Sequence, residues 1–210
     1  MNQVWHREAV GGLWEEMGGL QFDFLANQGL KPDHKLLDIG CGSMRGGVHF
    51  VSYLENGNYY GVDCNKALLD AGRNELETQG LLWKDPILEE ISDFAFVRLG
   101  AKFDFLLAQS VFTHLDLNSI MRCLVNVTKV MSPLGRFYAT FFLNHAGPTY
   151  LDPIPHPTRD GCRIVSHYDQ DPYHYDLGVL EWIANQIGLN ARYIGDWNHP
   201  RDQRMLLFTR

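Results

Sequence analysis

The chain has 210 residues, of which 45% are hydrophobic and 20% charged, so it can bury a substantial core as one domain. Its net charge of −7 argues against nucleic-acid binding, because lysines and arginines must displace the counterions of a polyphosphate backbone. The apolar runs are too short to cross a bilayer, and the start, MNQVWHREAV, lacks the basic-then-apolar order of a secretory signal. We expect a soluble, cytoplasmic protein that acts on a small molecule and has no membrane or nucleic-acid partner.

Residues 1–30 are predicted to form a helical lead-in. Apolar residues recur at steps of three and four between Ala9 and Leu30, which predicts an amphipathic helix. Gly29 and Pro32 are typical of a helix end, because glycine readily adopts a left-handed backbone and proline cannot continue a helix.

After this helix, short strands alternate with helices. The prediction is a strand at Lys35–Ile39, a helix at Val48–Leu54, a strand at Tyr59–Val62 that ends at Asp63, a helix at Lys66–Gln79, a weaker strand within Ile87–Phe96 and a strand at Phe103–Ala108. Such an alternation indicates parallel strands joined by crossover helices.

The second half of the chain continues the pattern and then changes it. The prediction is a helix with Asn118 as its cap and a stop at Ser132–Gly135, a strand at Arg136–Phe142, a last helix with Asp176 as its cap, and strands at Ala191–Trp197 and Met205–Thr209. Only a short turn joins the last two strands, so they should be antiparallel.

The segment Asn144–Asp176 shows neither a helical nor a strand period. It contains five of the nine prolines, four histidines and four tyrosines, and it is too long to be an idle connector. Long loops of this kind usually cover or shape a site, so we expect a lid on the substrate side. Its tyrosines would stack on a ring or sugar, or alternatively pack on their own domain.

A metal site in this segment is a weaker interpretation. Three of its histidines, His156, His167 and His174, stand among aspartates, and this combination suits a divalent ion. However, the segment has no HxH or HxxxH pair, and we expect no metal. The four cysteines of the chain form no CxxC pair, which also argues against structural zinc and a disulfide framework.

The stretch LLDIGCGSMRGGVHF, Leu36–Phe50, places a glycine-rich turn between the first strand and its helix. Arg45 stands where a dinucleotide-binding fingerprint needs its third glycine, which disfavours an NAD-linked oxidoreductase. Asp38 would repel a pyrophosphate but attract an amine or a sulfonium cation. Asp63, about 20 residues after the glycines, is placed to bind both hydroxyls of a ribose. The pattern therefore predicts an amino-acid cation joined to a nucleoside.

S-adenosylmethionine has this chemistry, and the chain resembles the class I SAM-dependent methyltransferases. The motifs that match are LLDIGCGSMRGG, YYGVDCN and FDFLLAQSVFTHL, and the final helix and strand pair have the order found in the family. The resemblance extends from about residue 35 onward. It implies a single methyltransferase domain over residues 1–210, with an α/β, Rossmann-like, doubly wound seven-stranded sheet that is mostly parallel and has an antiparallel C-terminal strand.

The resemblance also implies cofactor contacts. Asp38 would hold the amino group of the methionine part, Gly40 and Gly42 would pass beneath the cofactor, and Asp63 would hold the ribose. The remaining expected contacts are Cys41, Cys64, Gln109, and Asp93 and Phe94 as the partners of adenine. A plainer alternative for the two acids is that they cap a helix or a backbone amide. Gly46 and Gly47 are expected to let the first helix pack on the sheet.

Methyl transfer is an in-line displacement at an activated carbon, so positioning and exclusion of water matter most. A catalytic base is optional, but an alcohol or phenol acceptor would benefit from one. His114 and His145 follow the fourth and fifth strands and are the candidates, although both could be structural. We expect O-methylation of a metabolite or sugar. The alternatives are a SAM-binding module without activity and, less favoured, the oxidoreductase.

Overall fold

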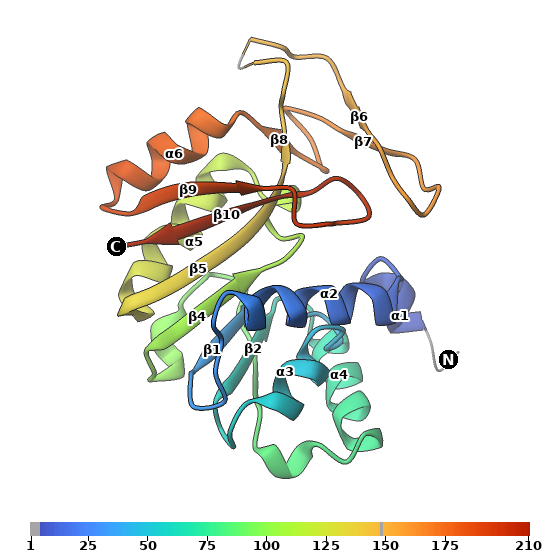
Figure 1. The fold of residues 1–210 in the computed structure, drawn as a ribbon, viewed down its shortest axis with the longest axis vertical. Coiled ribbons are helices and arrows are strands. Elements are labelled where there is room, and N and C mark those ends of the chain that lie inside the picture. The colour runs from blue at the N-terminus through green and yellow to red at the C-terminus, as the bar shows by residue number, and fades with distance from the viewer. Residues whose placement is uncertain (1–4, 148) are drawn as a thin grey trace. The chain divides into compact units, whose positions relative to one another are not determined.

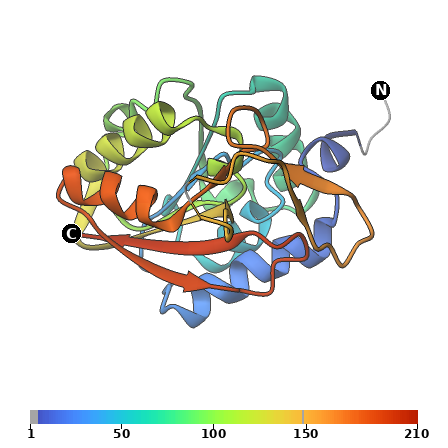
Figure 2. The ribbon, with the colours of Figure 1, turned by 90° about the horizontal axis from the view of Figure 1, so that it is seen from above.

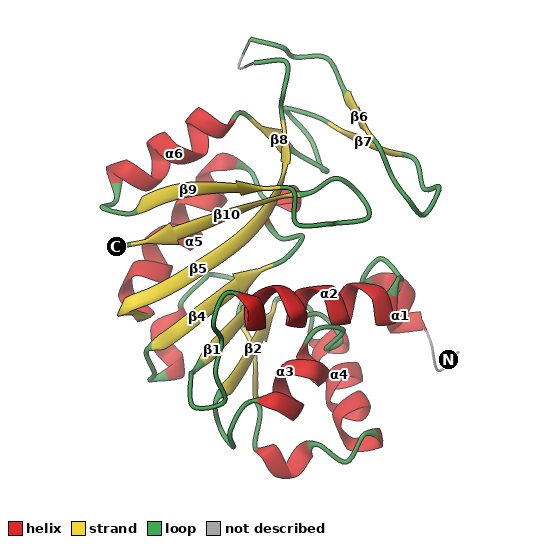
Figure 3. Cartoon of the chain, viewed as in Figure 1, coloured by secondary structure: helices red, strands yellow, loops and turns green. Residues whose placement is uncertain are grey.

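The computed structural model describes residues 5–147 and 149–210, and the chain divides into two compact units (Figure 1). The first unit runs to Ala95 and includes Lys102–Leu107. The second unit comprises Phe96–Ala101 and Ala108–Arg210. Both units combine helices with a sheet (Figure 3).

The first unit contains a parallel sheet with the strand order β3-β2-β1-β4. Its elements are α1 (Trp5–Ala9), α2 (Trp14–Asn27), β1 (Leu36–Ile39), α3 (Gly47–Tyr53), β2 (Tyr59–Asp63), α4 (Lys66–Thr78), the 3-10 turn η1 (Leu82–Lys84), β3 (Ile87–Glu90) and β4 (Phe103–Ala108). Every residue of β1 is buried, as expected for a strand with a parallel neighbour on each side.

Helices α2 and α3 pack closely because glycines lie at their contact (Figure 1). A Cβ atom on Gly46 would lie 2.5 Å from Oε1 of Gln21, and one on Gly18 would lie 2.5 Å from the carbonyl oxygen of Arg45. A Cβ atom on Gly47 would lie 2.4 Å from Cε of Met44. A Cβ atom on Gly47 would also lie 2.7 Å from the hydroxyl of Tyr59 on β2, so Gly47 lets α3 pack on the sheet as expected, whereas Gly46 packs against α2.

In the second unit, β10 pairs antiparallel with both β5 and β9. The elements of this unit are the 3-10 turns η2 (Phe96–Leu99) and η3 (Phe112–His114), α5 (Leu117–Val130), β5 (Met131–Leu143), β6 (Ile154–His156), β7 (Ile164–Ser166), β8 (His174–Tyr175), α6 (Leu177–Gln186), β9 (Asn190–Gly195) and β10 (Arg204–Thr209). Helices α5 and α6 lie together on one side of β9 and β10 (Figure 2).

The expected fold class is confirmed. The seven predicted strands correspond in chain order to β1–β5, β9 and β10, and the last two are antiparallel. Asp176 caps α6 as predicted, accepting a hydrogen bond from the backbone N–H of Gly178 at 2.8 Å. In the described part of the chain, no helix has both the length and the hydropathy of a bilayer-spanning segment.

The prediction of one helix from Ala9 to Leu30 is wrong, because a turn separates α1 from α2. Gly11 and Gly12 have φ angles of 88° and 63°, and Leu13 has a φ of 48°. This left-handed backbone cannot belong to a right-handed helix, and the glycine pair makes it accessible at low cost.

Two further boundaries differ around α5. The cap is Asp116 rather than Asn118, and its carboxylate accepts a hydrogen bond from the N–H of Ser119 at 2.7 Å. The segment Ser132–Gly135 does not lie in a turn but within β5, which begins at Met131 directly after the helix. A proline near the start of a strand is tolerated where its missing N–H leaves no pairing donor unmet.

The segment predicted to lack regular structure contains three short strands. β6 and β7 form an antiparallel pair, and β8 pairs in parallel with the end of β5 through Phe142 and His174. Figure 1 shows the β6–β7 hairpin extending away from the β5–β10–β9 strands.

Candidate functional site

The glycine turn after β1 is fastened to the end of β2. Gly40 and Gly42 have φ angles of 71° and 55°, which glycine adopts without strain. The backbone N–H groups of Gly40 and Cys41 both donate to the carbonyl oxygen of Val62, at 2.8 and 3.1 Å. The turn therefore has a defined shape, with an exposed backbone at Gly40 and a buried one at Gly42.

Asp63 joins this turn to the start of α4. Its Oδ2 accepts a hydrogen bond from the N–H of Gly42 at 2.9 Å, and its Oδ1 accepts one from the N–H of Asn65 at 2.8 Å. This is the plainer capping role considered for the residue. Each carboxylate oxygen has two acceptor positions, so Asp63 retains the capacity to accept hydrogen bonds from two hydroxyls.

Asp38 lies deeper, with only 3% of its surface exposed at the end of β1. The hydroxyl of Tyr59 donates to its Oδ2 at 2.8 Å. Burial raises the pKa of the Asp38 carboxyl to about 7, although the hydrogen bond from Tyr59 opposes the shift. The sequence analysis did not identify Tyr59, because a tyrosine at the start of a buried strand resembles an ordinary core residue.

The segment 5–13 lies against the same turn, and we call it the N-terminal clasp. Nη1 of Arg45 donates to the carbonyl oxygens of Val10 and Gly12, at 2.7 and 2.8 Å. A Cβ atom on Gly42 would lie 2.7 Å from Cγ1 of Val10. Arg45, which disfavoured a dinucleotide site in the sequence, thus has a structural role in holding the clasp.

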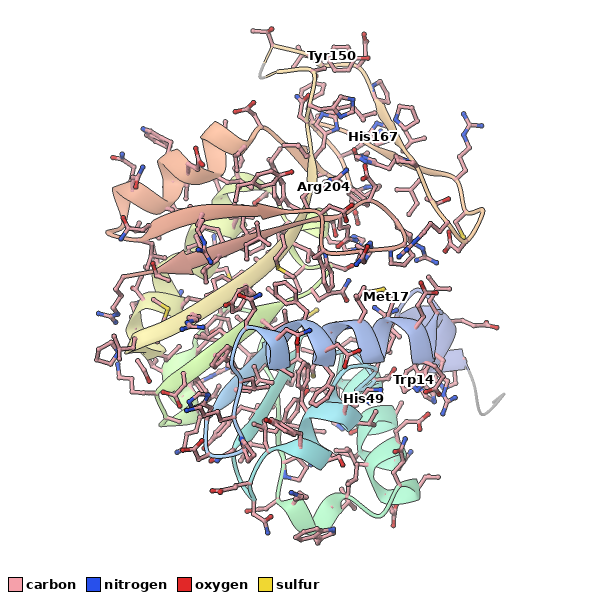
Figure 4. All side chains as sticks on the ribbon, viewed as in Figure 1. Trp14, Met17, His49, Tyr150, His167 and Arg204 are labelled. Carbon is pink, nitrogen blue, oxygen red and sulfur yellow. The ribbon has the colours of Figure 1, made fainter. Side chains whose placement is uncertain are left out.

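A buried carboxylate on α4 holds the other end of the clasp. Nε and Nη2 of Arg7 donate to the two oxygens of Glu75, at 2.9 and 3.1 Å, and Nε2 of His6 lies 3.3 Å from Glu75. The guanidinium of Arg7 also lies 4.6 Å from the ring centre of Trp14, which is labelled on α2 in Figure 4. A bidentate salt bridge of this kind fixes both the distance and the orientation of the guanidinium and the carboxylate.

The other residues of the first unit that were expected to contact the cofactor are Cys41, Cys64, Asp93 and Phe94. Cys41 is buried and Cys64 exposed, and desolvation raises the pKa of both thiols, so neither is activated as a thiolate. Asp93 follows β3 and accepts a hydrogen bond from the N–H of Ala95 at 3.1 Å, while Phe94 has a positive φ of 60°.

Gln109 follows β4 and belongs to a polar cluster of the second unit. Its Nε2 lies 2.6 Å from Oγ of Ser110 and 3.2 Å from Nε2 of His199. Ser110 and Thr140 both contact Oε1 of Gln203, at 3.0 and 2.7 Å. The turn after β4 is thereby tied to the loop before β10.

His114 and Asp171 form a hydrogen-bonded pair that could not be predicted from the sequence. Nδ1 of His114 lies 2.6 Å from Oδ1 of Asp171, and both side chains are more than half exposed. The backbone adds a second link, since the N–H of Tyr173 donates to the carbonyl oxygen of Thr113 at 2.7 Å. His145, the other predicted catalytic residue, is exposed just after β5.

A chain of four hydrogen-bonded side chains ties the hairpin to β8 and to the loop before β10, and we call it the buried histidine chain. Nδ1 of His156 lies 3.3 Å from Asp202, and its Nε2 lies 2.6 Å from Oγ of Ser166. The same Oγ lies 3.0 Å from Nδ1 of His174. Burial lowers the pKa of both histidines, so both are neutral near pH 7.

Because the serine hydroxyl has a single proton, the donor and the acceptor of each hydrogen bond in the buried histidine chain are fixed. His156 must donate its Nδ1 proton to the Asp202 carboxylate, so its Nε2 accepts the hydroxyl proton of Ser166. The oxygen of Ser166 then accepts from His174, whose Nε2 is left as a bare lone pair. That nitrogen is buried and has no hydrogen-bond partner among residues 5–147 and 149–210.

The second unit also contains a hollow of about 200 Å³ beside the hairpin. Its walls are Pro157, Thr158, Arg159, Asp196, Asn198, His199, Pro200 and Asp202. Across the described residues, no group of three or more histidines, cysteines or acids is arranged to hold a metal ion.

Comparison with known proteins places this geometry in context. Residues 37–137 match a family model described as a methyltransferase domain. The fold is similar to that of magnesium protoporphyrin IX methyltransferase from Synechocystis with bound SAM, at 15% identity and a TM-score of 0.65, over 93% of this chain and 79% of that one. It is also similar to that of an S-adenosylmethionine-dependent methyltransferase from Clostridium acetobutylicum, at 14% identity and a TM-score of 0.68, over 98% of this chain and 96% of that one. A methyltransferase from Streptomyces caelestis is similar at 14% identity and a TM-score of 0.67, over 95% of this chain and 97% of that one.

Proposed function

We propose that the chain is a class I SAM-dependent methyltransferase and that it methylates an oxygen atom of a small-molecule acceptor. S-adenosylmethionine is the cofactor, and when bound it supplies a methyl group already activated by its sulfonium. The enzyme then has to position the acceptor, exclude water and remove a proton.

The residues of the glycine turn fit the cofactor. Asp38 is a buried acid that would pair with the ammonium group, and a cation at that position would compensate the cost of burying its charge. Gly40 is exposed and has no side chain, which permits close approach to the backbone, and Gly42 lets the clasp residue Val10 pack against the same turn. Asp63 would accept hydrogen bonds from the ribose hydroxyls with its remaining acceptor positions.

The pairing of His114 with Asp171 is the observation that carries the choice of an oxygen acceptor. A carboxylate at Nδ1 holds the imidazole in the tautomer whose Nε2 is free of a proton, and it stabilises the imidazolium that forms. Nε2 of His114 would take the proton of the acceptor hydroxyl as the oxygen bonds to the methyl carbon. A hydroxyl requires this help because it is a weak nucleophile while protonated.

The hollow beside the hairpin supports an acceptor of limited size. About 200 Å³ corresponds to roughly seven water molecules at ~30 Å³ each, which suits one ring or sugar unit. Arg159, Asp196 and Asp202 give its wall charges of both signs, which suit a hydroxyl-rich compound. We assign the segment 144–176, which supplies part of this wall, the role of acceptor-side lid.

Methyl transfer from labelled SAM to a panel of phenols, sugars and amines tests the proposal. The His114→Gln variant should bind the cofactor normally and lose about 10²- to 10⁴-fold in kcat on hydroxyl acceptors, the usual contribution of a general base. His145→Gln is the matched control and should retain its rate. Turnover of amines alone, or a full rate in His114→Gln, would contradict O-methylation through this base. Binding without turnover of any acceptor would favour a non-catalytic module.

A further inference from the structure

Tyr59 and Asp38 form a fully buried pair beneath the glycine turn. Tyr59 is 2% exposed and Asp38 is 3% exposed, and 2.8 Å separates the hydroxyl from Oδ2. The same hydroxyl lies 3.4 Å from the sulfur of Met44, which is itself buried in the turn. A buried carboxylate with one fixed donor has a restricted orientation, because turning away would leave both groups unsatisfied.

Two glycines, Gly61 and Gly47, leave space for the side chain of Tyr59 next to the carboxylate. Gly61 pairs with Asp38 across β1 and β2, and a Cβ atom there would lie 3.1 Å from Cε1 of Tyr59. A Cβ atom on Gly47, the first residue of α3, would lie 2.7 Å from the hydroxyl. An alanine at position 47 would clash with the hydroxyl itself, whereas one at position 61 would first meet Leu88 and would crowd the ring only slightly.

We propose that Tyr59 is a positioning residue for cofactor binding, which orients the Asp38 carboxylate and holds it ionised for the ammonium group of the cofactor. The proposal rests on the assignment of Asp38 to that group in the proposed function. A hydroxyl donor favours the charged form of its acceptor, whereas desolvation favours the neutral form. Without Tyr59, the buried acid would take up a proton and lose its attraction for a cation.

The pH dependence of binding follows from the charges around the carboxylate. The hydrogen bond from Tyr59 and the charge of Arg45 lower the pKa of Asp38, while burial and the charge of Asp63 raise it. In the free protein Asp38 is therefore protonated below about pH 7 and ionised above it. Cofactor affinity should rise with pH through this range and then level off.

Calorimetry with S-adenosylhomocysteine and 5′-methylthioadenosine separates this role from a general effect on the fold. Both ligands carry the nucleoside, but only the first has the ammonium group. Tyr59→Phe should weaken S-adenosylhomocysteine about 10-fold at pH 6, as expected when a charged group loses a hydrogen bond, and leave methylthioadenosine unchanged. Between about pH 5.5 and 7.5, below the range where an α-amino group deprotonates, the affinity of the wild type should begin to level off, whereas that of Tyr59→Phe should still rise, because its pH of half-maximal affinity moves up by about one unit.

Tyr60→Phe is the matched control on the same strand. Its ring packs edge-on against Phe103 at 5.0 Å, and the variant should bind both ligands as the wild type does. An unchanged pH profile in Tyr59→Phe, or an equal loss for both ligands, would overturn the positioning role.

Asp38→Asn distinguishes failure of this inference from failure of the proposed function. If Asp38→Asn binds S-adenosylhomocysteine as tightly as the wild type at pH 7.5, the assignment of the ammonium group to Asp38 is wrong. If it binds weakly while Tyr59→Phe binds normally, the assignment stands and the role of Tyr59 falls. The double variant Asp38→Asn/Tyr59→Phe should lose no more affinity than Asp38→Asn alone, because the hydroxyl acts only through the carboxylate. Additive losses would contradict the positioning role.

Discussion

Removal of the hydroxyl of Ser166 should destabilise the second unit substantially. Ser166 is completely buried, and its Oγ is the central member of the buried histidine chain. In Ser166→Ala, Nε2 of His156 loses its donor and Nδ1 of His174 loses its acceptor. A buried polar group without a partner costs about 1–3 kcal/mol, so two such groups should lower the free energy of unfolding by about 2–6 kcal/mol.

Urea denaturation at pH 8 measures this loss, because both histidines are neutral there in the folded and unfolded protein. Ser52→Ala, at an exposed position of α3, is the control and should change the free energy of unfolding by less than about 0.5 kcal/mol. A loss below about 1 kcal/mol in Ser166→Ala would refute the reasoning, since it would mean that neither nitrogen depends on the hydroxyl.

The same reasoning gives a pH dependence that proton NMR can follow. The pKa of each histidine is lowered in the folded protein, so the unfolded chain binds more protons below about pH 6.5. The stabilising contribution of the histidine chain is therefore complete above that pH and is lost as the pH falls. Ring signals of His156 or His174 that titrate at or above 6.5 would contradict it.

Two further predictions concern the glycine turn and the hairpin. Asp63→Ala should fold but weaken S-adenosylhomocysteine by about 1–3 kcal/mol in calorimetry, and wild-type affinity would remove Asp63 from the cofactor site. Replacing Thr158–Cys162 by glycine and serine keeps β6 and β7; it should spare cofactor binding yet abolish transfer to the true acceptor, whereas normal turnover would exclude the lid role.

The strand positions could be predicted because short, continuous apolar runs are buried on both faces of a parallel sheet. Phe103–Ala108 is an example, with its predicted and observed bounds identical. The positions of Asp38 and Asp63 could be predicted because each lies at or next to the end of such a run, beside a glycine turn or a helix start, while their contacts with the cofactor stay predictions. In both cases the signal is local in the sequence.

The contacts that could not be predicted join residues far apart in the chain. His114 and Asp171 are 57 positions apart, and β8 becomes a strand only because His174 meets Phe142. Tyr59 differs from its neighbour Tyr60 only by facing the side of β2 where Asp38 lies. Such pairings depend on register and side-chain direction, which composition and periodicity do not encode.

The N-terminal clasp makes cofactor binding measurable without knowledge of the acceptor. Arg7, a trypsin site, is held by its salt bridge to Glu75. The turn against which Val10 packs carries the glycines proposed to lie at the cofactor. By thermodynamic reciprocity, any free energy by which the cofactor stabilises the clasp equals the free energy by which the clasp stabilises the cofactor. The rate of tryptic cleavage at Arg7, with and without S-adenosylhomocysteine, therefore reports that coupling energy directly wherever opening is fast and reversible.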